Sequence, residues 1–131
     1  MRRTTPRSIL ARSLLLLICF LPGMAICADT ATAVRSALAS GQPALIEFGA
    51  ETCSQCKRMK VVLDGISQRY KGRAHVVQVN VNKDPAVTRQ FKIMVIPTLV
   101  FFDAKGKEVG RTYGFMDEVK VAKKLHDLGA N

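Results

Sequence analysis

Two cysteines separated by two residues, Cys53 and Cys56, form the pattern in this sequence that is best suited to chemistry. At the first turn of a helix such a pair closes a small disulfide ring. The free N–H groups of that turn, together with the helix dipole, favour the thiolate form of Cys53. Cys53 is therefore the expected nucleophile. Cys56, one turn deeper, then attacks the mixed disulfide on Cys53 and releases the reduced partner.

The segment from Cys53 to Tyr70 is expected to be the helix that positions both thiols. It contains no proline and a single glycine, Gly65. Its apolar residues recur at spacings of three and four, which predicts a helix with one apolar stripe. These residues are Met59, Val62, Leu63, Ile66 and Tyr70.

The elements around this helix are predicted to alternate between helices and strands in one domain, in the order αβαβαββα. The run 44–48 (ALIEF) is apolar on both faces except at Glu47, which is typical of a central strand in a covered sheet. Asp84 and Pro85 supply a cap and a first-turn proline for a short helix. We expect helices at 30–40, 84–91 and 117–128, and strands at 44–48, 74–81, 97–102 and 108–113, the last two joined as a hairpin.

Residues 1–28 have the pattern of a signal peptide. Four arginines precede the apolar run 14–21 (LLLLICFL), and small residues follow around Cys27 and Ala28, where cleavage is expected. Lipidation at Cys27 and an uncleaved anchor remain open alternatives. We therefore expect an exported, periplasmic or extracytoplasmic domain at 29–131, in which Cys53 and Cys56 are the only cysteines.

The net charge of +10 does not indicate a nucleic-acid partner. Four arginines belong to the leader, and the lysines and arginines of the remaining chain are interspersed with aspartates and glutamates. Such a mixture is typical of solvated faces.

The sequence resembles the thioredoxin family between about residues 33 and 128. The resemblance rests on Phe48 to Lys57 (FGAETCSQCK) and on Ile96-Pro97-Thr98. It implies the thioredoxin fold, an α/β domain with a mixed central β-sheet and helices on both faces. It also implies that the Ile96–Pro97 bond is cis, that Pro97 faces the two cysteines, and that the backbone of Ile96 pairs with an extended substrate segment.

The resemblance also implies that Glu47 is a buried acid that moves a proton to and from the resolving thiol, Cys56. Burial should raise its pKa. The alternative is that the long side chain reaches solvent. The chain departs from the family at Thr52, at Ser54-Gln55 and at Gly49, so the substrate surface formed by Thr52, Ser54, Gln55, Ile96 and Pro97 is expected to differ from that of other members.

Other functions for two such cysteines are less well supported by the sequence. A zinc site needs four ligands, whereas only isolated His75 and His126 are available, so no metal is expected. The stretch between Cys56 and Pro97 has no room for the helical domain inserted in known exported oxidases. Copper carriers of this fold usually have three residues between their cysteines. A non-enzymatic binding module, an oxidase or isomerase, and a reductase of haem-attachment cysteines remain open.

We therefore predict an exported thiol:disulfide oxidoreductase that reduces protein disulfides, with Cys53 and Cys56 as its redox couple and no bound cofactor. A reductase in an oxidising compartment also implies a membrane electron donor. We expect a monomer.

Overall fold

The computed structural model describes residues 29–131, so the expected signal peptide at 1–28 lies outside the described residues. Over residues 29–131, no helix is both long and apolar enough to cross a membrane.

The observed elements follow the predicted order αβαβαββα. They are α1 (Thr30–Leu38), β1 (Ala44–Gly49), α2 (Ser54–Arg69), β2 (His75–Asn80), α3 (Pro85–Gln90), β3 (Thr98–Phe102), β4 (Glu108–Tyr113) and α4 (Glu118–Asp127). The strands form one sheet in the order β2-β1-β3-β4. β1 is parallel to β2 and antiparallel to β3, so the sheet is mixed and β1 is central, as predicted.

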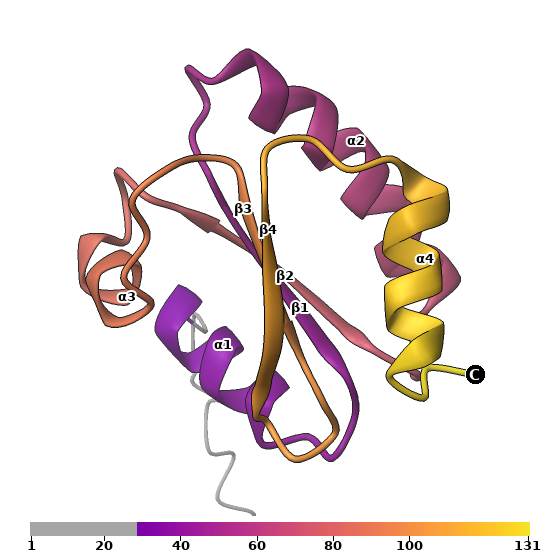
Figure 1. Cartoon of the computed structure of the whole chain (residues 1–131). Helices are drawn as coiled ribbons and strands as arrows, with labels where there is room; N and C mark the ends of the chain where they lie inside the picture. Colours follow the sequence, from indigo (N-terminus) through magenta and orange to yellow (C-terminus); the bar gives the residue numbers. More distant parts are fainter. Residues whose placement is uncertain (1–28) are drawn as a thin grey trace, which may run out of the picture.

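Helices cover both faces of this sheet, with α1 and α3 on one face and α2 and α4 on the other (Figure 1). Alternation along β1 divides its side chains between the two layers. Leu45 packs in the cluster with α2 and α4, whereas Ile46 and Phe48 pack in the cluster with α1 and α3. The predicted mixed sheet with two helical layers is therefore confirmed.

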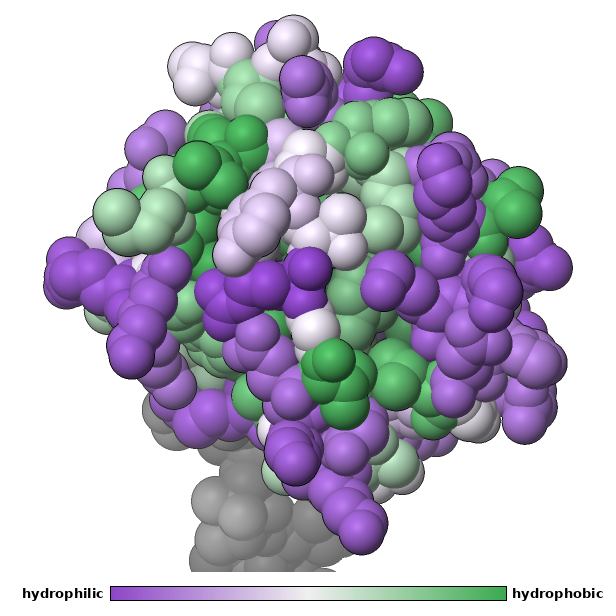
Figure 2. All heavy atoms as spheres, in the orientation of Figure 1, coloured by the Kyte–Doolittle hydropathy of each residue, from purple (hydrophilic) through white to green (hydrophobic). Residues whose placement is uncertain are grey.

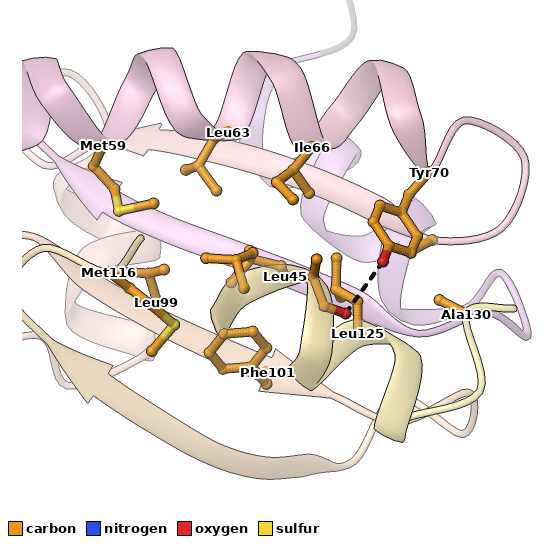
Figure 3. Packing of buried hydrophobic residues seen from close by; sticks show 13 residues of the cluster. Leu45, Met59, Leu63, Ile66, Tyr70, Leu99, Phe101, Met116, Leu125 and Ala130 are labelled. Atoms are coloured by element: carbon orange, nitrogen blue, oxygen red, sulfur yellow. Dashed lines mark hydrogen bonds between the residues drawn. The ribbon is translucent and has the colours of Figure 1, made fainter. Parts of the chain in front are cut away.

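The larger cluster fills the space between the sheet and the helices α2 and α4 (Figure 3). Met59, Leu63 and Ile66 of α2 are fully buried, at the spacings seen in the sequence. Each such side chain contributes about 1.5 to 3 kcal/mol relative to an exposed position. The Tyr70 hydroxyl donates to the carbonyl of Ala122 at 3.2 Å and so links the two helices. This packing fixes α2, and with it the position of the cysteines.

The smaller cluster lies under α1 and α3. Phe91 follows α3 and packs between Phe48 and Phe102, with ring centroids 5.2 and 6.0 Å away. Pro85 occupies the first turn of α3, as predicted, but the expected cap differs. Asp84 precedes the helix, yet its side chain makes no capping hydrogen bond.

The hairpin between β3 and β4 turns at Gly106, whose φ of +73° suits a residue without a side chain. Oδ1 of Asp103 accepts hydrogen bonds from the N–H groups of Lys105 and Lys107. Phe101 pairs with Gly110 but Phe102 pairs with Glu108, so one extra residue forms a bulge in β4.

Candidate active site

α2 begins at the same end of the sheet as the loops before β3 and after β4 (Figure 1), and Cys53 is the residue that precedes its first turn. Cys53 and Cys56 form a disulfide, with their Cα atoms 5.2 Å apart. Cys53 caps the N-terminus of α2, because its Sγ accepts a hydrogen bond from the backbone N–H of Cys56 at 3.1 Å. The predicted position of the pair at the start of this helix is confirmed.

The two sulfurs differ in their access to solvent. Cys53 is partly exposed, whereas Cys56 is only 6% exposed and packs on the apolar side of α2. A partner can therefore reach Cys53 directly, while Cys56 is shielded by its own helix. In the reduced state, the N–H groups at the helix start would also stabilise a thiolate at Cys53.

The Ile96–Pro97 peptide bond is cis, as the resemblance implied. The carbonyl of Pro97 accepts a hydrogen bond from the backbone N–H of Gly114 at 2.8 Å, and the Thr98 hydroxyl donates to the carbonyl of Val95 at 2.7 Å. The first bond joins the segment before β3 to the residue after β4, and the second closes a turn within that segment. Pro97 is buried and Ile96 is exposed at its side.

Glu47 lies on the face of β1 that is covered by α2, because it alternates with Ile46 and Phe48. Its side chain is 4% exposed, so the prediction of a buried acid agrees with the structure. Among the described residues, its Oε1 atom has no hydrogen-bond partner. Burial raises the pKa of Glu47 to about 7, against an opposing effect of the Lys60 charge. The carboxyl group can therefore gain or lose a proton near neutral pH.

Gly49 creates the space that Glu47 and Cys56 share. A Cβ atom at Gly49 would overlap Oε1 of Glu47 and would lie 3.1 Å from Cβ and 3.3 Å from Sγ of Cys56. The carboxyl group and the buried sulfur thus approach the same point in front of Gly49. A side chain here would overlap the carboxyl group and crowd the sulfur.

A cleft of about 260 Å³ lies beside this point, between α2 and the β1–β2 side of the sheet. Lys60 at its rim pairs with Asp64 at 2.9 Å, and Asp64 also accepts a hydrogen bond from Gln78 Nε2 at 3.0 Å. The cleft thus connects the acid and the buried sulfur with polar surface groups. Its lining residues are Glu47, Gly49, Ala50, Glu51, Cys56, Lys57, Lys60, Gln78, Val79 and Asn80.

The remaining predicted site residues surround the exposed sulfur. Thr52 and Ser54 are exposed on either side of Cys53 in the chain. Gln55 is also exposed, and its Oε1 atom lies 3.7 Å from the position that a Cβ atom would take on Gly114. Gly114 in turn is hydrogen-bonded to Pro97. The structure therefore brings Gln55 close to the cis-proline segment.

Sequence reasoning missed the roles of Gly49 and of Lys60 in this site. Gly49 follows Glu47 by two residues, so both lie on the same face of one strand. A glycine on the same strand face as a glutamate, whose side chain is longer than that of an aspartate, was a usable signal. Lys60 follows Cys56 by four residues, which places both on one side of α2.

We expected no metal at this site because the sequence offers too few ligand residues. In residues 29–131, no group of three or more His, Cys, Asp or Glu side chains could hold a metal ion. His126 is exposed on α4, where its Nδ1 atom lies 3.9 Å from Asp127.

Comparisons with known proteins agree with this geometry. The family model for thioredoxin matches residues 26–127. Thioredoxin 1 of Nostoc sp. is 34% identical over 91 residues, which are 70% of this chain and 84% of that protein. Thioredoxin 1 of Synechococcus elongatus is 35% identical over 95 residues, 72% and 88% of the two chains.

The fold is also found among solved structures. A crystal structure of chloroplastic thioredoxin z superimposes with a TM-score of 0.65 at 25% identity, covering 75% of this chain and 88% of the other. Together with the Cys53–Cys56 disulfide, these likenesses show that the chain belongs to the thioredoxin family of thiol:disulfide oxidoreductases.

Proposed function

We propose that this thioredoxin-family protein is an exported reductase of disulfides in other proteins, acting through Cys53 and Cys56 without a bound cofactor. The observation that carries the proposal is the asymmetry of the disulfide. Cys53 caps α2 at the surface, whereas Cys56 is buried beside an acid with a pKa near 7. This arrangement assigns the attacking and resolving roles to different sulfurs.

In the first step, the Cys53 thiolate attacks one sulfur of a substrate disulfide. A bond forms between Cys53 and that sulfur, the substrate disulfide breaks, and the second substrate sulfur leaves as a thiolate. The helix N-terminus favours the Cys53 thiolate at the start of this step.

In the second step, the Cys56 thiol loses its proton to the Glu47 carboxylate and attacks the Cys53 sulfur. The Cys53–Cys56 bond forms, the bond between Cys53 and the substrate sulfur breaks, and that sulfur leaves as a thiolate. The substrate has then gained two electrons and the protein pair has lost two. Because the pKa of Glu47 is raised to about 7, the carboxylate is a strong enough base to assist this transfer at neutral pH.

The substrate segment is proposed to lie across Pro97, with the backbone of Ile96 available for pairing. Thr52, Ser54 and Gln55 are exposed around Cys53 and would contact the residues next to the substrate cysteine. Direct pairing of an extended segment with a free backbone edge is a common mode of peptide recognition.

Export is proposed from the arginines and the apolar run of residues 1–28, followed by a separate domain at 29–131. Outside the cytosol, a monomeric reductase needs a membrane protein of the thiol-reducing type to return electrons to Cys53 and Cys56.

The reduction potential of the pair tests the direction of electron flow. Residues 29–131 are equilibrated in thiol/disulfide buffers and the oxidised fraction is measured. A value near or below about −250 mV supports the reductase, whereas about −120 to −180 mV would show an oxidase or isomerase instead.

Fractionation of cells that express the full chain tests export. The proposal expects the protein outside the cytoplasm, with a mass that corresponds to loss of residues near 1–28. A full-length protein confined to the cytoplasm would contradict export without affecting the redox assignment.

A further inference from the structure

An unusual number of large apolar side chains is exposed around the cis-proline. Met94 is 88% exposed and Tyr113 is 61% exposed, and Val95, Ile96 and Phe115 are exposed as well. We call these five residues the apolar collar. The other exposed large apolar residues of the described chain, Val61, Val109 and Val119, are spread over α2, β4 and α4.

The apolar collar lies around the cis-proline segment, which Gln55 of the active-site helix approaches at Gly114. Tyr113 pairs with Thr98 across the sheet, and the backbone of Gly114 bonds to Pro97. Figure 2 shows the face in front of β4, where green and pale spheres gather among some purple ones near the end at which α2 begins, while the lower part is mostly purple with a smaller green group. Apolar surface gathered in one place marks an interaction site more often than scattered residues do.

Arg58 adds a fixed positive charge to this surface. Its guanidinium lies 4.4 Å from the centre of the Phe115 ring, an arrangement that holds the side chain beside the collar. No ion pair involving Arg58 is found within residues 29–131.

Two acids that lie close in the chain to Cys53 and to Phe115 are each paired with a lysine. Glu51 is paired with Lys83 at 2.6 Å, and Asp117 is paired with Lys120 at 2.9 Å. The surface beside the cis-proline therefore combines the apolar collar with the charge of Arg58, while the polar residues Thr52, Ser54 and Gln55 lie around the exposed sulfur.

We propose that the apolar collar and Arg58 select polypeptide substrates with an apolar residue next to the reactive cysteine and an acidic residue that pairs with Arg58. This inference rests on the proposed function and adds its substrate class. A carboxylate matches the exposed edge of the guanidinium, while apolar side chains cover the collar.

The test compares synthetic peptides that carry one cysteine in a mixed disulfide with mercaptoethanol. One peptide has Leu beside the cysteine and Glu three residues away, and two others have Gln or Lys in place of Glu. A fourth keeps Glu but has Ser in place of Leu. Reduction of hydroxyethyl disulfide, which is small and uncharged, is measured in parallel, and every peptide rate is divided by it.

In low salt, we expect the Glu peptide to be reduced about three- to fivefold faster than the Lys peptide, with Gln between them. The difference should shrink at about 0.5 M salt because exposed charges are screened. The Ser peptide should be reduced several-fold more slowly than its Leu counterpart. Met94→Ser should narrow the Leu-over-Ser difference.

Arg58→Glu should reverse the charge preference. Lys71→Glu is the matched control, since it makes the same charge change in the exposed turn after α2, at the end remote from the disulfide. The control should keep the preference of the unaltered protein. Equal normalised rates for the Glu and Lys peptides, or an Arg58→Glu protein that still prefers Glu, would overturn the inference. Failure to reduce hydroxyethyl disulfide would instead contradict the proposed function.

Discussion

On its inner side, the disulfide meets Glu47 and Gly49, whereas its outer side meets exposed loops and the apolar collar. The inner residues are constrained in three ways. Alternation along β1 sets the face on which they lie, α2 covers that face, and the space in front of Gly49 is narrow. The side chains of Met94 and Tyr113 on the outer side are largely exposed, so we expect their exchange to disturb the fold less. The comparison suggests that proton handling is tightly constrained by packing, while substrate choice is not.

The largest expected effect separates the two sulfurs. Cys53→Ser should lower disulfide reduction by at least about a thousandfold, because the nucleophile is lost. Cys56→Ser should also stop turnover but should accumulate a mixed disulfide with substrate, visible by non-reducing electrophoresis. If the Cys53→Ser protein trapped substrate and the Cys56→Ser protein did not, the assigned roles of the inner and outer sulfurs would be reversed.

Glu47→Gln should slow the attack of Cys56 on the mixed disulfide, and so the release of substrate, by at least about tenfold. The reason is that no carboxylate remains to take the Cys56 proton. Stability gives an independent readout. The folded pKa of about 7 exceeds the usual 4.5, so the folded state retains the proton more strongly and stability falls as pH rises from about 4.5 to 7. Over this pH interval the free energy of unfolding should fall by about 3 kcal/mol.

The measurement is urea unfolding of the oxidised protein between pH 4 and 8. The Glu47→Gln protein should lack the decline that the unaltered protein shows in this interval. An identical decline in both proteins would mean that another group causes it.

Gly49→Ala tests the packing of the inner side. Overlap of the new Cβ with Glu47 and Cys56 should lower the free energy of unfolding by about 1 to 3 kcal/mol. Gly65→Ala is the control, because nothing lies within 4 Å of a Cβ there and alanine should stabilise α2 by up to about 1 kcal/mol. Equal effects at the two positions would show that position 49 is not tightly packed.

Lys60→Met should have a smaller effect on the inner side. Removing the positive charge that favours ionised Glu47 should raise the pKa of Glu47 further above its ordinary value. The readout is the pH dependence of the Glu47 carboxyl carbon in NMR spectra. Lys57→Met removes another lysine from the cleft and should shift that titration less. A lower pKa in the Lys60→Met protein would contradict this arrangement.

The smallest effect on stability is expected on the outer side. Met94→Ser should change the free energy of unfolding by no more than about 0.5 kcal/mol, because the side chain is almost fully exposed. The measurement is urea unfolding of the Met94→Ser and Gly49→Ala proteins, whose free energies of unfolding are compared directly. A loss as large as that of Gly49→Ala would mean that the outer side is also constrained by packing.

Much of the fold was predictable because periodicity within one element reports its buried face. The spacing of Met59, Leu63 and Ile66 predicted α2, and the apolar run around Glu47 predicted a central strand. The burial of Glu47 and the cis Ile96–Pro97 bond were expected from the family resemblance and agree with the structure.

Contacts between elements were harder to predict. Whether Arg58 meets Phe115, or Lys60 lies near Glu47, depends on how α2 is placed on the sheet, which spacing along the chain does not specify. The sequence likewise left open whether Met94 packs inside or lies on the surface, and the structure places it on the surface. Asp84 stands at the expected helix start, but only side-chain geometry shows that it makes no capping bond.

The bulge in β4 has a consequence for behaviour at high concentration. β4 is an edge strand, and a regular edge offers unpaired N–H and C=O groups to the edge of another molecule. The extra residue near Val109 interrupts that row, and Glu108 and Arg111 add charge along it. The interruption discourages strand addition along β4 and so protects the protein from edge-to-edge aggregation.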